Sequence, residues 1–274
     1  MAKNIKKILA VLETGPQKKF GQNFLVNEKK TNFIVNEIIL CNKKSVVEIG
    51  PGLGSITEKI IDKDLKVVCI EKDKILSKYL QNKYCTSSNI KIINEDILRI
   101  SIKKIIDADK VIFGNLPYNI ASKILSNFID EFHNVENSIG IFMFQKEVAD
   151  KIMSKVGSKS YNAFVVKIRS FFNVEKLLDL NESDFWPQPK IKSTLIKLVV
   201  RDNQRIPAKE FKEFSDFIFN SFRIRRKTLI NNLLNIYPKN AILKSFYLMN
   251  LKESSRAQDL SVQEFTELFT NIRN

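Results

Sequence analysis

The sequence predicts an α/β fold, a Rossmann-like sheet of seven strands followed by a small all-helical C-terminal domain. Two observations carry this prediction. From Ser45 onward, short apolar runs alternate with segments that have helical spacing. Such alternation is typical of a parallel, doubly wound sheet. Beyond Arg201 only helical patterns remain, and 274 residues are enough for one large domain and one small one.

The predicted strands follow the apolar runs in chain order. Five runs lie at 45–49, 67–71, 90–94, 110–114 and 139–144, and two further candidates lie near 171–178 and 193–200. Asn27 has the side chain of a helix N-cap, so we expect a helix over about 28–41. A further helix is expected from about Tyr161.

Changes in composition divide the chain into three parts. Residues 1–19 are polar and rich in lysine, so we expect a flexible basic arm with room for one short helix. The alternating segment predicts one domain over 20–203. The helical patterns that follow predict a second domain over 204–274.

The charge balance indicates a polyanionic partner. The chain has 45 Lys and Arg residues against 30 Asp and Glu residues, a formal net charge of +15. Each phosphate that a protein neutralises releases counterions, so an excess of this size favours nucleic acid. Apolar runs are too short for a membrane span or a signal peptide. We therefore expect a cytoplasmic protein.

Metal and disulfide chemistry find no support in the sequence. Cys41, Cys69 and Cys85 show no CxxC spacing, and His133 has no cluster of partner ligands. We expect no metal site.

A glycine-rich turn follows the first predicted strand. It contains Gly50, Gly52 and Gly54, and the next helix would be capped by Ser55 or Thr57. Glycines let the backbone approach a ligand closely. The spacing is GxGxG, and Ser55 stands where a dinucleotide-binding turn has its third glycine.

An acidic residue stands at the end of each of the first three strands. Glu48 suits a ligand with an ammonium group, Glu71 has the spacing of an acid that bonds ribose hydroxyls, and Asp96 could accept from an adenine amino group. These acids come with glycines and without a phosphate-binding lysine. The set favours S-adenosylmethionine over NAD as the cofactor.

The fourth strand ends in Asn115-Leu116-Pro117-Tyr118, at the sheet edge where ligands bind in open α/β folds. Asn115 Oδ1 and the Leu116 carbonyl, held by the fixed φ of Pro117, could accept both N–H bonds of a base's exocyclic amine. Tyr118 offers a ring for that base to stack on. Drawing both N–H bonds out of the ring plane makes the nitrogen lone pair nucleophilic, which predicts methyl transfer to the amine.

Two basic clusters are candidates for contact with phosphates. One lies beside the cofactor motif and consists of Lys18 and Lys19. The other is expected at the start of a helix in the second domain and consists of Arg223, Arg225, Arg226 and Lys227. Cations at a helix start oppose the helix dipole, which argues against a purely structural role.

These segments together resemble the KsgA family of small-subunit ribosomal RNA adenine N6,N6-dimethyltransferases over nearly the full length. The matching segments are Phe20–Leu25, Glu48–Gly54, Glu71, Asp96, Asn115–Tyr118, Phe144–Ala149, Phe185–Lys190 through Ser193, Arg225–Leu229 and Arg256 through Ser261. The resemblance implies methyl transfer from S-adenosylmethionine to two adjacent adenosines near the 3′ end of the small-subunit (16S) RNA. It also implies a monomer that acts on a pre-ribosomal particle during ribosome biogenesis.

The resemblance also implies roles for single residues. Asn23 and Leu25 would lie against the cofactor with Gln22 as a neighbour, and Gly50 would contact its methionine part. Asn115 would touch both the cofactor and the target amine. Tyr118 and Phe185 would take the two faces of the flipped adenine. Tyr161-Asn162 and Lys151 depart from the family pattern, and both lie outside the expected cofactor pocket.

Three alternatives stay open at this point. The protein could be a ribosome-assembly factor that acts mainly by binding RNA, which is compatible with catalysis. It could methylate one adenosine of large-subunit RNA, although the long helical tail and the Phe185–Ser193 stretch disfavour this. A DNA adenine methylase is less favoured, because no separate target-recognition domain is evident.

Overall fold

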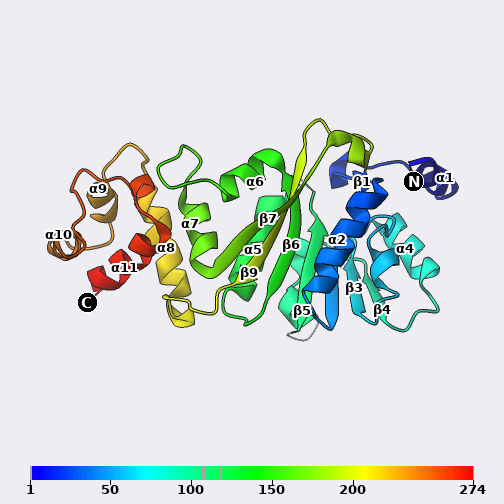
Figure 1. Ribbon diagram of the computed structural model, residues 1–274, viewed down its shortest axis with the longest axis horizontal. Coiled ribbons are helices and arrows are strands. Elements are labelled where there is room, and N and C mark those ends of the chain that lie inside the picture. The colour runs from blue at the N-terminus through cyan, green and yellow to red at the C-terminus, as the bar shows by residue number, and fades with distance from the viewer. Residues whose placement is uncertain (1, 106–108, 118, 274) are drawn as a thin grey trace. The chain divides into compact units, whose positions relative to one another are not determined.

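The computed structural model describes residues 2–105, 109–117 and 119–273 (Figure 1). The chain forms two compact units. The first comprises the residues up to Ala149 together with Val174–Val200, and the second comprises Asp150–Asn173 and Arg201–Asn274. Within the described ranges, no helix is long and apolar enough to cross a lipid bilayer.

The first unit is built on a seven-stranded sheet of order β4-β3-β2-β5-β6-β9-β7. The strands are β2 (Ser45–Ile49), β3 (Lys66–Ile70), β4 (Ile90–Ile93), β5 (Lys110–Asn115), β6 (Ile139–Gln145), β7 (Phe172–Leu180) and β9 (Ser193–Val200). Neighbours from β4 to β6 pair in parallel, and β9 is antiparallel to β6. The predicted seven-stranded, Rossmann-like sheet is confirmed.

The strand order reverses between β2 and β5, which lie side by side although β3 and β4 come between them in sequence. Such a switch point opens a crevice at the carboxyl ends of the strands, because the connections leave toward opposite sides. The acidic residues and Asn115 follow these strand ends, so the topology brings them to one edge.

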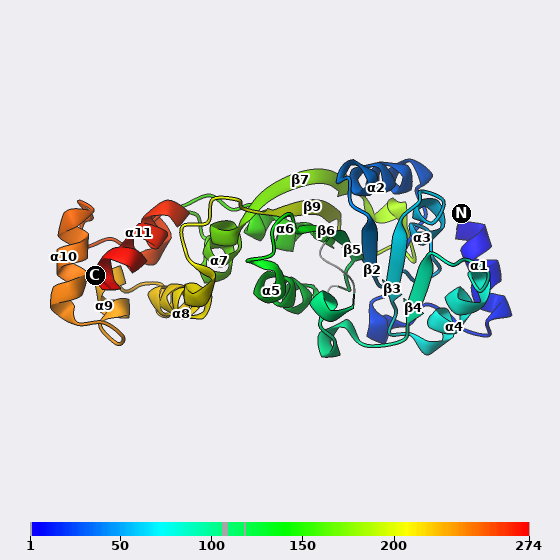
Figure 2. The same cartoon turned by 90° about the horizontal axis from the view of Figure 1, so that it is seen from below.

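Side chains alternate between the two faces of the sheet. On one face, Val46, Val111 and Phe113 pack in a single buried cluster with Ile34 and Ile38 of α2 (Glu28–Leu40). Figures 1 and 2 show α2 on this face and α5 (Ala121–Phe132) on the other. The apolar runs are continuous because both faces of the sheet are covered.

Two shorter helices of this unit are α3 (Thr57–Ile60) and α4 (Lys74–Lys83), and α6 (Lys146–Ile152) contains the boundary between the two units. Neither Ser55 nor Thr57 caps α3, because Ile56 holds the N-cap position. That expectation is wrong. The Thr57 hydroxyl donates to Glu48 Oε2 at 2.6 Å, which turns the Thr57 side chain toward the buried carboxylate.

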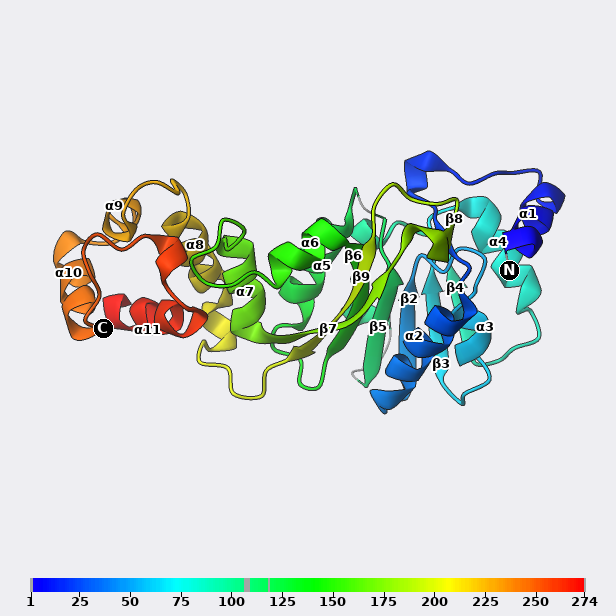
Figure 3. The same ribbon diagram turned by 45° about the horizontal axis from the view of Figure 1, so that its top comes forward.

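The N-terminal segment contains α1 (Ala2–Val11), whose Ile5 and Leu9 are buried against Phe24 and Leu76. Figure 3 shows α1 beside α4. This differs from the flexible arm expected over 1–19, because the apolar residues at helical spacing find a partner surface. The next strand, β1 (Phe24–Leu25), pairs antiparallel with β8 (Phe185–Trp186).

Asn27 caps α2 as predicted, and its side chain accepts from the Lys30 backbone N–H at 3.2 Å. Its Nδ2 also donates to Oδ1 of the buried Asp184 at 2.6 Å. We expect Asn27→Ala to lower the free energy of unfolding by about 1–3 kcal/mol, because a cap and a bond to a buried carboxylate are both lost. Urea denaturation followed by circular dichroism measures this change.

Asn27→Ser separates the two contributions. Serine can cap the helix but is too short to reach Asp184, so this variant should recover part of the loss. Equal stability of the alanine, serine and wild-type proteins would contradict the prediction.

The second unit contains helices only, apart from the first residues of β7. They are α7 (Ala163–Phe171), α8 (Phe211–Ser221), α9 (Leu229–Leu233), α10 (Lys239–Leu248) and α11 (Val262–Arg273). The predicted helical C-terminal segment is confirmed. Its core is aromatic, with the rings of Phe214 and Phe269 centred 5.2 Å apart.

The division into units differs from the one expected at residue 204, because residues 150–173 belong to the helical unit. The Phe171 ring on α7 lies 4.9 Å from Phe211 and 5.9 Å from Phe214, centroid to centroid. These aromatic contacts join segments far apart in sequence, so composition along the chain does not reveal them.

Candidate active site

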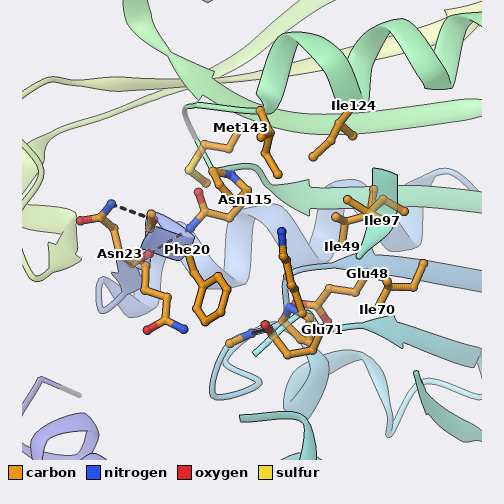
Figure 4. Close-up of a pocket in the computed structure, with 18 of the residues that line it drawn as sticks. Phe20, Asn23, Glu48, Ile49, Ile70, Glu71, Ile97, Asn115, Ile124 and Met143 are labelled. Atoms are coloured by element: carbon orange, nitrogen blue, oxygen red, sulfur yellow. Dashed lines mark hydrogen bonds between the residues drawn. The ribbon is translucent and has the colours of Figure 1, made fainter. Parts of the chain in front are cut away.

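A cavity of about 1080 Å³, its open mouth included, lies at the carboxyl edge of the sheet (Figure 4). Its walls come from the ends of β2, β3 and β5, from the loop after β4, and from residues 19–25. The sequence-predicted residues that line it are Lys19, Gln22, Asn23, Leu25, Glu48, Gly50, Gly52, Glu71, Asp96, Asn115 and Pro117. An open, mostly preformed cavity at this edge of an α/β sheet is the usual place for a ligand.

Glu71 stands at the end of β3 and is 6% exposed. Its Oε2 accepts from the Gly52 N–H at 3.0 Å and its Oε1 from the Asp73 N–H at 2.9 Å. These two bonds fix the carboxylate plane beside the glycine-rich turn. Each oxygen keeps a lone pair for a ligand hydroxyl.

Burial raises the pKa of Glu71 to about 7, against the lowering effect of the backbone N–H groups of Asp73 and Gly52. Burial likewise raises the pKa of Glu48 to about 7, opposed by the hydrogen bond from Thr57 and assisted by the nearby charge of Glu71. Two buried carboxylates that titrate near neutrality form a site that favours a cationic or hydroxyl-rich ligand.

Gly50 and Gly52 form the part of the turn that faces the cavity. Both have positive φ, +66° and +61°, which favours glycine. A Cβ at Gly50 would meet nothing within 4 Å, whereas a Cβ at Gly52 would lie 3.1 Å from the Phe24 ring. Open space beside the Gly50 backbone lets a ligand approach it closely.

Asp96 ends the loop after β4 and begins a short 3₁₀ helix (Ile97–Arg99). Its Oδ1 accepts from the Leu98 N–H at 3.0 Å, and its Oδ2 lies 2.8 Å from Lys72 Nζ. The hydrogen bond from Lys72 lowers the pKa of Asp96. An ionised carboxylate therefore stands at this end of the cavity.

Asn115 lies at the end of β5, and Figure 4 shows it facing the same cavity as Asn23, Phe20 and Glu71. Its Nδ2 donates to the Asn23 backbone carbonyl at 3.1 Å. This bond fixes which end of the amide is the donor, so Oδ1 stays available as an acceptor.

The other residues of the Asn115–Tyr118 motif do not all face the cavity as Asn115 does. The Leu116 side chain is buried and folds back over Gly114, where a Cβ would lie 2.6 Å from Leu116 Cδ2. Pro117 lines the cavity and packs on Gly21, whose φ is +63°. Tyr118 lies outside the described residues.

Besides Leu116, three predicted residues do not line the cavity. Phe185 is 2% exposed and belongs to the core cluster under α2, so its ring offers no face to the cavity in this structure. Gly54 packs instead against α4, where a Cβ would lie 3.0 Å from Leu80 Cδ2. Lys18 is exposed outside the lining.

The basic cluster of the second unit lies in the segment between α8 and α9 and not at the start of a helix as expected, because α9 begins only at Leu229. Arg223, Arg225, Arg226 and Lys227 are exposed. The Arg225 guanidinium donates to the backbone carbonyls of Ser158 and Lys159, so it also holds the 154–160 loop.

Sequence reasoning missed the roles of Phe20 and Gly114 in building the cavity, and Asp73 as the partner of the predicted residue Gln22. Gln22 Nε2 donates to Asp73 Oδ2 at 2.8 Å and thereby ties the N-terminal segment to the start of α4. Phe20 places a ring in the cavity, and Gly114 makes room for Leu116. A glycine inside an apolar strand was a usable signal for a close approach, whereas the partner of Gln22 had no local signal.

Comparison with known proteins places the chain in a family. The family model of ribosomal RNA adenine dimethylases matches residues 14–274. The ribosomal RNA small subunit methyltransferase A of Borreliella burgdorferi strain ZS7 is 37% identical over 269 residues, covering 98% of this chain and 93% of that protein. The same-named protein of Mycoplasmoides gallisepticum is 36% identical, covering 99% and 98%.

Solved structures share the fold. A dimethyladenosine transferase from Plasmodium falciparum superposes with a TM-score of 0.77 at 23% identity, covering 91% of this chain and 97% of that one. The 23S rRNA methyltransferase ErmE superposes with a TM-score of 0.71 at 21% identity, covering 92% and 100%. Both structures cover a similar share of this chain, so the helical C-terminal segment does not distinguish small-subunit from large-subunit RNA methyltransferases. The relatives with higher sequence identity are small-subunit methyltransferases. The match over residues 14–274, together with relatives above 35% identity along nearly the whole chain, shows that this protein belongs to the ribosomal RNA adenine dimethylase family of methyltransferases.

Proposed function

We propose that this protein transfers methyl groups from S-adenosylmethionine to N6 of two adjacent adenosines near the 3′ end of small-subunit ribosomal RNA. The observation that carries the proposal is the Asn115 amide, whose Nδ2 is held by the Asn23 carbonyl while Oδ1 faces a cavity edged with carboxylates. We further propose that it acts as a monomer, in the cytoplasm, on a pre-ribosomal particle.

The residues at the cavity fit the proposed cofactor. Glu71 would accept from the ribose hydroxyls, Asp96 from the adenine amino group, and the Gly50 backbone would lie against the methionine part. Glu48, fully inside the cavity wall, places negative charge near the ammonium group. Four carboxylates and two lysines line this cavity, Glu48, Glu71, Glu95 and Asp96 against Lys19 and Lys72, which suits a cationic ligand.

S-adenosylmethionine supplies a methyl group on a positively charged sulfur, which is already a strong electrophile. The protein's part is positioning, which is worth several kcal/mol in such reactions. Asn115 Oδ1 and the Leu116 carbonyl would accept the two N–H bonds of the adenine amine and turn its lone pair toward the methyl carbon. The C–S bond would break as the N–C bond forms, and the methylated amine would then lose its proton to water, so no residue need act as a base.

The target base has to leave its stack to enter the cavity. Tyr118 would stack on one face of it, and Lys19 stands in the cavity wall near the entering strand. In the second unit, the exposed and positively charged Arg223, Arg226 and Lys227 suit contact with RNA phosphates.

The proposal is tested on small subunits that lack N6,N6-dimethyladenosine. Purified protein and S-adenosylmethionine with a labelled methyl group should place N6,N6-dimethyladenosine at two adjacent positions near the 3′ end. Mass spectrometry of nuclease fragments locates the label. Free large-subunit RNA serves as the comparison substrate, and label on that RNA alone would show that the protein is instead a large-subunit methyltransferase.

A further inference from the structure

Lys72 lies between Glu71 and Asp96, the two acidic residues that the sequence analysis assigns to the nucleoside part of the cofactor. It directly follows Glu71 at the end of β3 and lines the cavity. The Asn94 side chain donates to the Glu71 carbonyl at 2.8 Å and to the Lys72 carbonyl at 3.4 Å. The backbone that carries Lys72 is therefore tied to the loop that carries Asp96.

The Lys72 ammonium reaches across to Asp96. Lys72 Nζ lies 2.8 Å from Asp96 Oδ2, while Asp96 Oδ1 accepts from the Leu98 N–H at 3.0 Å. The Asp96 side chain is 15% exposed and that of Lys72 is 52% exposed. Each carboxylate oxygen is thus held from one side, and each keeps a lone pair for a further donor.

This arrangement bears on which base the cavity accepts. A carboxylate held in a fixed plane accepts from an amino group and repels a carbonyl oxygen at the same place. An unpaired lysine ammonium would do the opposite, because it is a donor only and would bind a carbonyl oxygen. Pairing with Asp96 turns the ammonium toward the carboxylate and offsets its charge, which weakens that competing preference.

We propose that Lys72 is a positioning residue for the adenine subsite, where its ammonium holds Asp96 in the orientation that accepts the adenine amino group. The inference rests on the proposed function, in which the cofactor adenine lies at Asp96. It predicts that Lys72 sets discrimination between amino and carbonyl groups at position 6 of the purine.

The test compares two ligands by isothermal titration calorimetry, S-adenosylhomocysteine and S-inosylhomocysteine, which carries a carbonyl oxygen in place of the amino group. Lys72→Met keeps the aliphatic stem and removes the charge. It should weaken binding of the adenine ligand about threefold to fivefold, the range of a partly exposed ion pair. Binding of the hypoxanthine ligand should change less, so the preference for adenine should fall.

Lys78→Met is the matched control, because Lys78 is exposed on α4 outside the cavity and its loss changes the net charge equally. It should leave both affinities unchanged. In an Asp96→Ala background, Lys72→Met should have no further effect on adenine binding, since coupled residues are not additive.

The results distinguish failure of the proposed role of Lys72 from failure of the proposed cofactor site at Asp96. If Lys72→Met leaves the preference unchanged, or tightens adenine binding because the lysine occupies the subsite, Lys72 does not position Asp96. If Asp96→Ala leaves the affinity for S-adenosylhomocysteine unchanged, the proposed cofactor site itself is wrong.

Discussion

Replacing Asn115 by alanine should lower the rate of methyl transfer about 10²-fold or more, because the acceptor that orients the target amine is lost. Affinity for S-adenosylhomocysteine should change little, since Glu71 and Asp96 are untouched. Transfer is measured with labelled S-adenosylmethionine on undermethylated small subunits, and affinity by calorimetry. The variant should still bind these subunits in sedimentation, which separates catalysis from RNA binding.

Asn23→Ala is the matched control for this variant. Asn115 donates to the backbone carbonyl of Asn23, which alanine retains, so the Asn115 amide keeps its orientation. The control should therefore weaken cofactor binding more than it slows transfer at saturating cofactor. Unchanged transfer in Asn115→Ala would refute the role of the amide.

Affinity for S-adenosylmethionine should rise about tenfold or more between pH 6 and pH 8. The pKa values of Glu48 and Glu71 lie at about 7 in the free protein because both are buried. An ammonium group and ribose hydroxyls favour the ionised carboxylates, so the ligand must displace protons below pH 7. Calorimetry at a series of pH values, in buffers of different ionisation enthalpy, measures both the affinity and the protons released.

Glu48→Gln and Glu71→Gln should each reduce this pH dependence, because each removes one titrating group. Glu58→Gln is the control, since Glu58 is exposed on α3 outside the cavity. Affinity that does not vary with pH in the wild-type protein would contradict the prediction.

The raised pKa values of Glu48 and Glu71 also affect folding, where they make the protein less stable as the pH rises. Both glutamates hold protons in the folded protein that the unfolded chain releases above its ordinary pKa of 4.5. Their contribution to the free energy of unfolding is therefore present below about pH 4.5 and is lost as the pH rises to about 7. Asp96, Asp109 and Asp179 have pKa values lowered by lysine partners, so they act at lower pH and do not oppose this trend.

Local patterns were sufficient wherever a residue's neighbours in sequence decide its structure. Asn27 caps α2 because capping needs only the next turn of backbone. The strands match the apolar runs because burial on both faces selects such runs. Thr57 is the exception, because α3 begins at this residue and its hydroxyl donates to a buried carboxylate from another element.

The edge position of Glu48, Glu71, Asp96 and Asn115 was also predictable, since parallel strands bring their carboxyl ends together. Which aromatic rings face the cavity was not predictable. Phe185 turns into the core because β8 pairs with β1, a contact between segments 160 residues apart in the numbering. The glycines of the turn also differ in their surroundings, because Gly52 lies against Phe24 and Gly54 against α4, whereas Gly50 faces open space. The spacing of glycines in the sequence does not reveal these contacts.

The sequence alone determined the order of strands and helices, the set of strand-end acids and amide, and through its motifs the family. Tertiary structure decided which of these residues share the cavity and how their polar atoms are engaged, as with Gln22 on Asp73 and Lys72 on Asp96. The physical reason is that the two kinds of interaction act over different separations along the chain. Hydrophobic period and capping act over a few residues, whereas a side chain's hydrogen-bond partner depends on every element packed around it.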